Sequence, residues 1–269
     1  MSKPLLLGAV AYDPKVVPIW DGIRDYMTRG GAPMDYVLFS NYEAQVDALV
    51  DGFVDIAWNT NLAYVRSFRR LDGRCRAVAM RDTDVEFTSV LMTRPGSGIR
   101  GPEDLKGRSL AVGSRDSGHA AILPLYFIAR AGVDWQRDVQ VRRFDLDMGK
   151  HGDTGASEQA VLEAVASGQV EAGAVGDPFW ARALELRTVD PARVQAVWTS
   201  PPYHHCNFTV REDLVGERID SWVNTLLKMD YNNPEHRTLL DLEGLKRWMP
   251  GRVDGYRTLF EAVDEQRGL

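Results

Sequence analysis

The stretch that decides the fold is Leu110-Ala-Val-Gly-Ser-Arg-Asp-Ser-Gly-His-Ala-Ala-Ile-Leu-Pro124. Its apolar start, 110–112, is typical of a buried strand, and the apolar run 120–131 predicts a helix. The turn between them, 113–118, therefore leads into a helix start, where backbone N–H groups without an intrahelical partner carry partial positive charge. Such a turn can hold an anionic or polar ligand, although its aspartate or serine could equally serve only as the helix N-cap.

Size and composition place the chain among globular proteins with a full core. Its 269 residues are 44% hydrophobic and 26% charged, which allows one large or two modest domains. The net charge is −6 and no basic run is present, so we expect no nucleic-acid partner, because phosphate binding needs a face rich in lysine and arginine. The apolar runs fall far below the ~18 residues of a membrane helix, so we expect no membrane insertion.

The first residues and the cysteines bear on cellular location. The segment from Met1 to Tyr12 has only a short apolar run and passes straight into patterned sequence, so it predicts a first strand and not a signal peptide. Cys75 and Cys206 alone define no disulfide framework. We expect a cytoplasmic protein from the sequence as written, and a periplasmic or extracellular one if a leader has been removed.

Strands and helices alternate along most of the chain. Two successive segments show this order, which predicts parallel sheets with helices on their faces. We expect strands at 5–11, 36–39, 54–58 and 76–80 in the first segment, and at 87–93, 110–112, 139–144 and 170–175 in the second. Two further strands are expected at 194–198 and 208–210. Beyond residue 214 the pattern is helical, with helices expected at 219–229, 239–248 and 253–263.

A short unit occurs in both segments. Residues 48–57 can be laid over residues 164–173, and each unit joins a helix end, a glycine and a strand that begins with valine and an acidic residue. Such joints are common in α/β proteins, so the repeat alone is only suggestive. We predict two similar α/β lobes, the first made of residues 1–84 and 213–269 and the second of residues 85–212.

Several motifs together resemble a known family. They are Asn41-Tyr-Glu-Ala-Gln-Val-Asp-Ala-Leu-Val-Asp-Gly-Phe-Val-Asp-Ile-Ala57 with Asn61-Leu-Ala-Tyr64, Ser97-Gly-Ile with Asp104-Leu-Lys-Gly107, the Ser-Gly of the first stretch, and Glu163-Ala-Val-Ala-Ser-Gly168. Over nearly its whole length the chain resembles the phosphate/phosphite/phosphonate-type substrate-binding proteins of ABC transporters. The resemblance implies the type II periplasmic-binding fold, in which two α/β lobes, each a mainly parallel sheet flanked by helices, close over a ligand held between them.

One departure from the family bears on the ligand. The family's oxyanion cradle usually has Ser-Thr-Ser-Gly-Tyr, and here Arg115-Asp-Ser-Gly-His119 aligns with it. The Asp116 carboxylate would repel phosphate, because like charges a few ångströms apart in a desolvated site repel strongly. Arg115 could offset that charge by turning inward, but it could equally point to solvent. We therefore expect a ligand other than simple phosphate or phosphonate.

The resemblance implies ligand contacts in loops at strand ends, where open α/β sheets bind ligands. Histidines in these loops add groups that titrate near neutrality. Aromatic side chains there can stack on a planar or cationic ligand, and packing between lobes explains them about as well. The candidate ligand-binding residues are Tyr12, Trp58, Asn59, Asn61, Tyr64, Ser114, Arg115, Asp116, Ser117, His119, Lys150, His151, Asp177, Trp180, His204 and His205.

Two classes of function follow from these residues. The first is a solute-binding protein for a small polar or anionic molecule, with an ABC permease as its partner if it is exported. The second is an enzyme on the same scaffold, a lyase of the dehydratase or decarboxylase type, in which Asp116, His119 and His151 would carry acid–base chemistry. No cofactor is predicted. A divalent metal on histidine and aspartate side chains is the less favoured alternative, because no His-x-x-x-His or Cys-x-x-Cys spacing is present.

Overall fold

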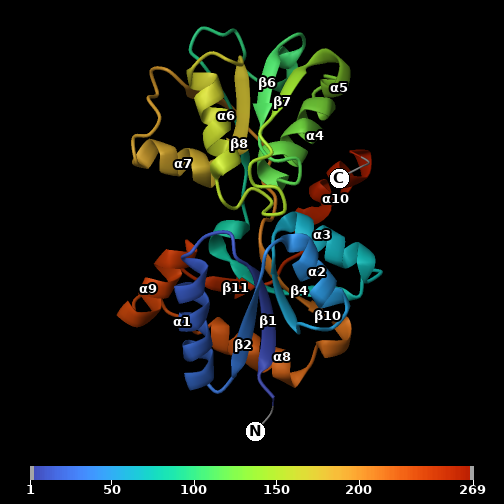
Figure 1. Cartoon of the computed structure of the whole chain (residues 1–269), viewed down its shortest axis with the longest axis vertical. Helices are drawn as coiled ribbons and strands as arrows, with labels where there is room; N and C mark the ends of the chain where they lie inside the picture. The colour runs from blue at the N-terminus through green and yellow to red at the C-terminus, as the bar shows by residue number, and fades with distance from the viewer. Residues whose placement is uncertain (1–2, 267–269) are drawn as a thin grey trace. The chain divides into compact units, whose positions relative to one another are not determined.

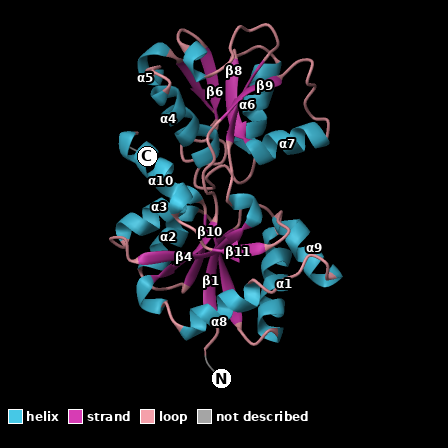
Figure 2. Ribbon diagram, turned by 180° about the vertical axis from the view of Figure 1, so that it is seen from behind, coloured by secondary structure: helices cyan, strands magenta, loops and turns pink. Residues whose placement is uncertain are grey.

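Two α/β units make up the structure, a computed structural model that describes residues 3–266. Unit 1 contains residues 3–86 and 204–256, and unit 2 contains residues 87–203 and 257–266 (Figure 1). Each unit has a sheet of its own, and its helices lie on the outside of that sheet (Figure 2). Among the described residues, no helix combines the length and the apolar character needed to cross a bilayer.

The sheet of unit 1 has six strands in the order β11-β4-β10-β3-β1-β2. Strand β1 lies between β2 and β3 and runs parallel to both, whereas β10 runs antiparallel to its neighbours β3 and β4. The strands are Leu5–Val10 (β1), Met34–Phe39 (β2), Ile56–Asn59 (β3), Cys75–Arg81 (β4), Asn207–Arg211 (β10) and Trp248–Pro250 (β11).

The helices of unit 1 each bury an apolar face. In the first helix Ile19, Trp20, Ile23 and Met27 follow helical spacing, and all four lie in the core of this unit. The helices are Val16–Arg29 (α1), Tyr42–Val50 (α2), Asn61–Arg70 (α3), Glu217–Leu226 (α8) and Pro234–Glu243 (α9), with short 3-10 turns at Asp82–Asp84 (η1), Glu212–Leu214 (η4) and Asp254–Tyr256 (η5).

The sheet of unit 2 has five strands in the order β7-β6-β8-β5-β9. Strand β6 runs parallel to β7 and β8, and β5 runs antiparallel to β8 and β9. The strands are Ser89–Thr93 (β5), Ser109–Val112 (β6), Gln140–Arg143 (β7), Ala172–Gly176 (β8) and Gln195–Thr199 (β9). The helical segments are Pro102–Leu105 (η2), Gly118–Ile122 (η3), Leu123–Arg130 (α4), Trp135–Asp138 (α5), Ala156–Ala166 (α6), Asp177–Glu185 (α7) and Arg257–Glu265 (α10).

Two segments lie in a different unit from the one that the sequence predicts. The pattern predicts residues 85–212 as one lobe, but β10 pairs with β3 and β4, and its Phe208 belongs to the core of unit 1. The pattern also predicts that residues 213–269 return to the first lobe, but α10 packs against α4, where Tyr126 donates a hydrogen bond to Glu261. Periodicity indicates the type of an element and not the sheet that it joins.

The helix predicted at 239–248 is wrong in its second half. Helix α9 ends at Glu243, because Gly244 takes a left-handed conformation with φ of +79° and its N–H closes the last turn. The chain then continues into β11, an edge strand that pairs antiparallel with β4. Trp248 lies in the core of unit 1, where its ring is 5.8 Å from that of Trp58.

Candidate ligand-binding site

Polar loops gather at one edge of the sheet of unit 2. Strands β6, β7 and β8 are parallel, so their carboxyl ends meet at the same edge. The turn 113–117 follows β6, the loop 144–155 follows β7, and Asp177 follows β8. Open α/β sheets bind ligands outside the carboxyl ends of their strands. This edge therefore carries the strongest candidate site in the unit.

The turn after β6 is built to start a helix. The Ser117 hydroxyl oxygen accepts a hydrogen bond from the N–H of Ala120 at 3.2 Å, which makes Ser117 the N-cap. The first turn, η3, is a π-helix, a conformation found frequently at functional sites, and it continues directly into α4. Gly113 allows the turn to approach this helix, since a Cβ there would lie 2.8 Å from that of Ala120. N–H groups of such a first turn can meet an anion.

His119 lies inside this edge and faces a buried carboxylate. Its Nε2 is 3.6 Å from Oε1 of Glu158, and each residue is only 4% exposed. Burial lowers the pKa of His119, but the carboxylates of Glu158, Asp153 and Asp147 together outweigh that effect, so the pKa lies above its usual value of 6.5. Glu158 also accepts a hydrogen bond from the N–H of Gly176 at 2.7 Å, which ties α6 to the end of β8.

The loop after β7 lies directly on the turn. Oδ2 of the buried Asp116 accepts a hydrogen bond from the N–H of Gly149 at 2.6 Å. His151 is 1% exposed and has φ of +54°, an uncommon conformation for a residue with a side chain. At Gly152, φ is +93°, and a Cβ would lie 2.6 Å from Oγ of Ser117 and 2.9 Å from the His119 ring. Only glycine fits this close approach.

A second carboxylate holds the same loop together. The buried Asp147 accepts hydrogen bonds from the hydroxyls of Ser114, Ser157 and Thr154. The hydroxyls of Ser114 and Ser157 also lie 2.8 Å from each other. The Ser114 hydroxyl, predicted to contact a ligand, is therefore committed to the loop.

Asp177 and Tyr203 anchor neighbouring backbone. Oδ1 of Asp177 accepts a hydrogen bond from the N–H of Thr88 at 2.9 Å, just before β5. The Ser89 hydroxyl donates to the carbonyl of His119 at 2.7 Å, so the Tyr203 hydroxyl, 2.8 Å away, donates to Ser89. Burial raises the pKa of Tyr203 well above its usual value, which keeps this phenol a donor.

The two basic residues predicted near the turn differ in placement. Arg115 points outward and pairs with Asp145 at 2.6 Å, and more than half of its side chain is exposed. It therefore does not offset the charge of Asp116 in the way that the sequence allowed. Lys150 is partly buried, and this burial lowers its pKa despite the nearby Asp153. Trp180 is half-buried and packs against the core of unit 2 beside α6.

In unit 1 the predicted contacts at the end of β3 serve packing. The Trp58 ring lies 4.5 Å from that of Phe208, with the Arg81 guanidinium 5.2 Å above it. Asn59 has no exposed surface, and its side chain accepts from Gln45 and donates to Ser67 and Thr209. These contacts give Trp58 and Asn59 a packing role in unit 1, and their contact with a ligand stays a prediction.

The adjacent histidines are also held by internal contacts. Nδ1 of His204 lies 2.8 Å from the carbonyl oxygen of Val85, and its Nε2 lies 3.1 Å from Oδ1 of Asp254. Nδ1 of His205 lies 3.0 Å from Sγ of Cys206 and 3.6 Å from Oδ1 of Asp84. Asp84, His205 and Cys206 together have donor atoms suited to a metal. The Arg81 guanidinium, however, binds both carboxylate oxygens of Asp84 and opposes a cation there.

Three further predicted residues lie near the strand ends of unit 1. Tyr64 is buried, with its ring 4.6 Å from that of Tyr256, and Tyr12 is half-buried against the core. Asn61 is 1% exposed, and its side-chain oxygen Oδ1 accepts a hydrogen bond from the N–H of Leu62. Its amide nitrogen has no hydrogen-bond partner among the described residues. Of the candidates in unit 1, Asn61 alone keeps such a buried donor in the described part of the chain.

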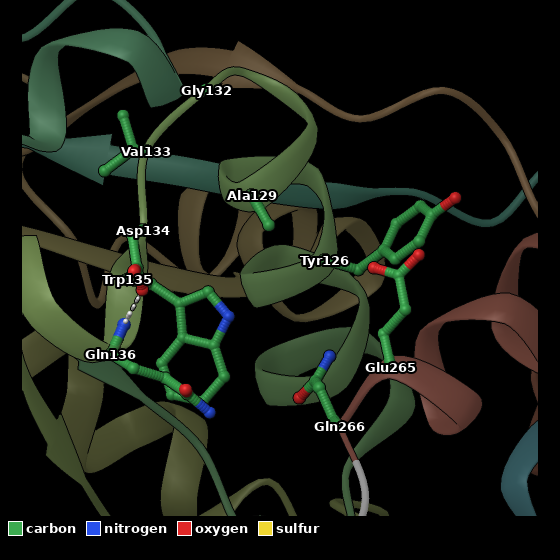
Figure 3. Close-up of a pocket in the computed structure, with 9 residues that line it drawn as sticks. All are labelled: Tyr126, Ala129, Gly132, Val133, Asp134, Trp135, Gln136, Glu265 and Gln266. Atoms are coloured by element: carbon green, nitrogen blue, oxygen red, sulfur yellow. Dashed lines mark hydrogen bonds between the residues drawn. The ribbon is translucent and has the colours of Figure 1, made fainter.

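A pocket of about 410 Å³ lies elsewhere on unit 2, among α4, α5 and the end of α10. Figure 3 shows the Trp135 ring on one side of it and Tyr126 and Glu265 on the other. No residue predicted for ligand binding lines this pocket. Its carboxylates Asp134 and Glu265 are paired with Arg137 and Arg130.

Sequence reasoning missed three polar residues of the candidate site. Glu158, Asp147 and Ser157 are buried there, and none of them was predicted. The only signal was the pair Ser157-Glu158, which lies in the first turn of α6, where an acidic residue is ordinary. Ser157 and Glu158 join the site only because the start of α6 lies near the carboxyl ends of β6 and β8, which local sequence does not show.

Comparison with known proteins supports the two-lobed fold. A family model described as "ABC transporter, phosphonate, periplasmic substrate-binding protein" matches residues 9–256. The chain is similar to the "Probable ABC transporter phosphite binding protein PhnD1" of Prochlorococcus marinus, with 25% identity over 236 residues, which span 84% of this chain and 76% of that protein.

Solved structures show the same architecture. The structure of PhnD1 from Prochlorococcus marinus in complex with methylphosphonate has a TM-score of 0.76 at 21% identity and covers 99% of each chain. XAC2383 from Xanthomonas citri bound to ATP also has a TM-score of 0.76, at 18% identity, with 99% of this chain and 98% of that chain covered. The predicted type II periplasmic-binding fold is thereby confirmed.

Proposed function

This chain belongs to the periplasmic substrate-binding proteins of phosphonate ABC transporters, and from that premise we propose that unit 2 binds a small phosphonate- or phosphite-like oxyanion. The family favours the binding protein over the enzyme that the sequence also allowed. One observation carries the proposal: the Ser117-capped helix start at the end of β6, with Asp116 and His119 buried beside it. Backbone donors of such a first turn suit an oxyanion.

From the sequence, Asp116 predicted a ligand other than simple phosphonate. The family match favours a phosphonate instead, and Asp116 suits one that carries a proton. A buried carboxylate repels a fully ionised dianion, but it accepts a hydrogen bond from the P–OH group of a monoanion. A sulfonate is fully ionised and has no such hydrogen to donate. We therefore propose that Asp116 favours a phosphonate over a sulfonate of the same shape.

Calorimetric titration of ligand-free protein with methylphosphonate and methanesulfonate tests this proposal. We expect tighter binding of methylphosphonate, and we expect Asp116→Asn to reduce that preference by about tenfold, which corresponds to about 1.4 kcal/mol. The matched control is Asp145→Asn, which removes an acid that pairs with Arg115 at the exposed side of the same turn. If the protein binds neither anion, or if Asp116→Asn leaves the preference unchanged, the proposal is wrong.

The same premise extends to partner and location. The description of the family as periplasmic supports a protein that works outside the cytoplasmic membrane, in place of the cytoplasmic location suggested by the sequence as written. We propose that it delivers its ligand to an ABC permease. Closure of the two lobes over the ligand stays a prediction, and the proposal needs no cofactor.

A further inference from the structure

We propose that the imidazolium form of His119 supplies the positive charge for the bound anion, and that Glu158 is the positioning residue that holds this ring. The inference rests on the proposed function, because it names the group that sets the charge of the same site.

The position of the ring is determined from several sides. A Cβ at Gly152 would lie 2.9 Å from its Cε1 and Nε2, and a Cβ at Gly176 would lie 3.1 Å from its Cδ2. The Phe87 ring lies 5.6 Å away, and the carbonyl of His119 accepts a hydrogen bond from Ser89. Two backbone segments therefore close on the imidazole, and its Nε2 faces Glu158 at 3.6 Å.

The charged groups around this ring are mostly acidic. Glu158 faces it from α6, while Asp147 and Asp153 act on it from the loop after β7. Asp116 belongs to the same turn, and Asp177 lies at the start of α7. An anion that enters this edge meets these carboxylates. A charged His119 offsets them locally, whereas the Arg115 guanidinium pairs outward with Asp145.

Two basic or phenolic groups complete these surroundings. Lys150 lies in the loop after β7 and is partly buried, and Tyr203 stays neutral over the physiological range. A cation in the first turn of a helix opposes the helix dipole, so His119 needs a compensating carboxylate. Glu158 meets this need and also binds the N–H of Gly176, which fixes its own position.

Anion binding should weaken as His119 loses its proton. Burial lowers the pKa of His119 and the Glu158 carboxylate raises it, with a net rise above 6.5. Below that raised value the pair is neutral, and above it Glu158 remains as a bare negative charge. The favourable contribution is thus fully present at low pH and is lost as the pH rises through the pKa of folded His119.

The test measures methylphosphonate affinity from about pH 6 to pH 9 in the wild-type protein and in His119→Gln. The proposed ligand is the monoanion in both proteins, so its ionisation cancels in the ratio of their dissociation constants. We expect the wild-type protein to bind about tenfold more tightly at the acidic end, with the ratio approaching one at the alkaline end. The control is His236→Gln, a partly buried histidine of α9 in unit 1, which should keep the wild-type profile.

A second measurement starts from the wild-type protein, so its main result does not depend on folding of a variant. In wild-type protein, NMR titration of the His119 ring should give a higher pKa with saturating methylphosphonate than without it, because linkage is reciprocal. In Glu158→Gln the pKa of His119 should fall in the ligand-free protein. Methylphosphonate binding with no change in the His119 pKa, or a flat affinity ratio, would overturn the inference alone. Absence of any anion binding would instead overturn the proposed function and this inference with it.

Discussion

The ends of β3 in unit 1 and β6 in unit 2 have the same local structure, but their side chains have different roles. Each strand leads into a helix with a hydroxyl N-cap. The Thr60 hydroxyl accepts from the N–H of Ala63 in unit 1, and the Ser117 hydroxyl accepts from the N–H of Ala120 in unit 2, both at 3.2 Å. Next to Thr60, the Asn59 amide is bonded inside the core. Next to Ser117, Asp116 and His119 bring ionisable groups to the sheet edge. A hydroxyl N-cap therefore does not identify a ligand site by itself. The residues next to the cap decide whether the helix start can bind a ligand.

The side chains at the end of β3 differ from those after β6 because they belong to a buried polar network in unit 1. It connects α2, β3 and β10 through side chains alone, and it ends at Tyr256, whose hydroxyl donates to the carbonyl of His205. Its members are Gln45, Asn59, Thr209, Asn207 and Tyr256. Because buried polar groups are costly to leave without hydrogen bonds, this network favours stability and one arrangement of the strands.

The largest effect on stability should come from Arg81→Ala in unit 1. The Arg81 side chain donates to both Asp84 oxygens, at 2.7 and 2.8 Å, and to the carbonyl of Glu243 at 3.0 Å. Asp84 has no exposed surface, so its carboxylate would stay buried without its cation. We expect the free energy of unfolding to fall by about 3–5 kcal/mol in urea titrations.

The control for that change is Arg76→Ala. Arg76 pairs with Glu212 at 3.1 Å, but both side chains are about half exposed. Exposed pairs typically contribute under about 1 kcal/mol. Equal decreases in the free energy of unfolding for Arg76→Ala and Arg81→Ala would show that burial does not determine how much these ion pairs contribute to stability.

A middle-sized effect should separate the neighbours Asn59 and Asn61. Asn59→Ala leaves buried partners without their hydrogen bonds and should reduce the free energy of unfolding by about 1–3 kcal/mol, with methylphosphonate affinity unchanged. Asn61→Ala removes a buried nitrogen that has no hydrogen-bond partner among residues 3–266, so it should cost less stability. Urea unfolding and calorimetry of the two variants check this. A larger loss of stability in Asn61→Ala than in Asn59→Ala would contradict the assignment of Asn59 to packing and of Asn61 to a candidate ligand contact.

The smallest effect should come from Arg115→Gln beside the candidate site. The guanidinium is exposed and pairs with Asp145, so we expect the urea midpoint to stay within error of the wild-type value. Methylphosphonate affinity should change by less than about twofold. A tenfold loss of affinity would mean that Arg115 turns toward the ligand, and the outward placement would then not describe the bound protein.

Part of the candidate site could be predicted from sequence. Ser117, Asp116 and His119 follow directly from a strand, a turn and a helix in sequence order. His151 was found in a polar loop, and the structure buries it near that turn. Glu158 could not be found in this way, because its contact with His119 joins residues 39 positions apart, from two different helical segments. The inward placement of Asn59 was equally hidden, since its partner Thr209 lies on β10.

Local pattern by itself determined most strand and helix types, outside β11, and the polar turn after β6, while the resemblance of several motifs indicated the two-lobed α/β family. It did so because hydrophobic period, capping and turn chemistry act over a few residues. Tertiary structure alone decided which sheet β10 and α10 join, which polar side chains turn into the core and which carboxylate meets His119. These outcomes depend on contacts between distant segments, where burial sets the charge and the hydrogen-bond partners of each group.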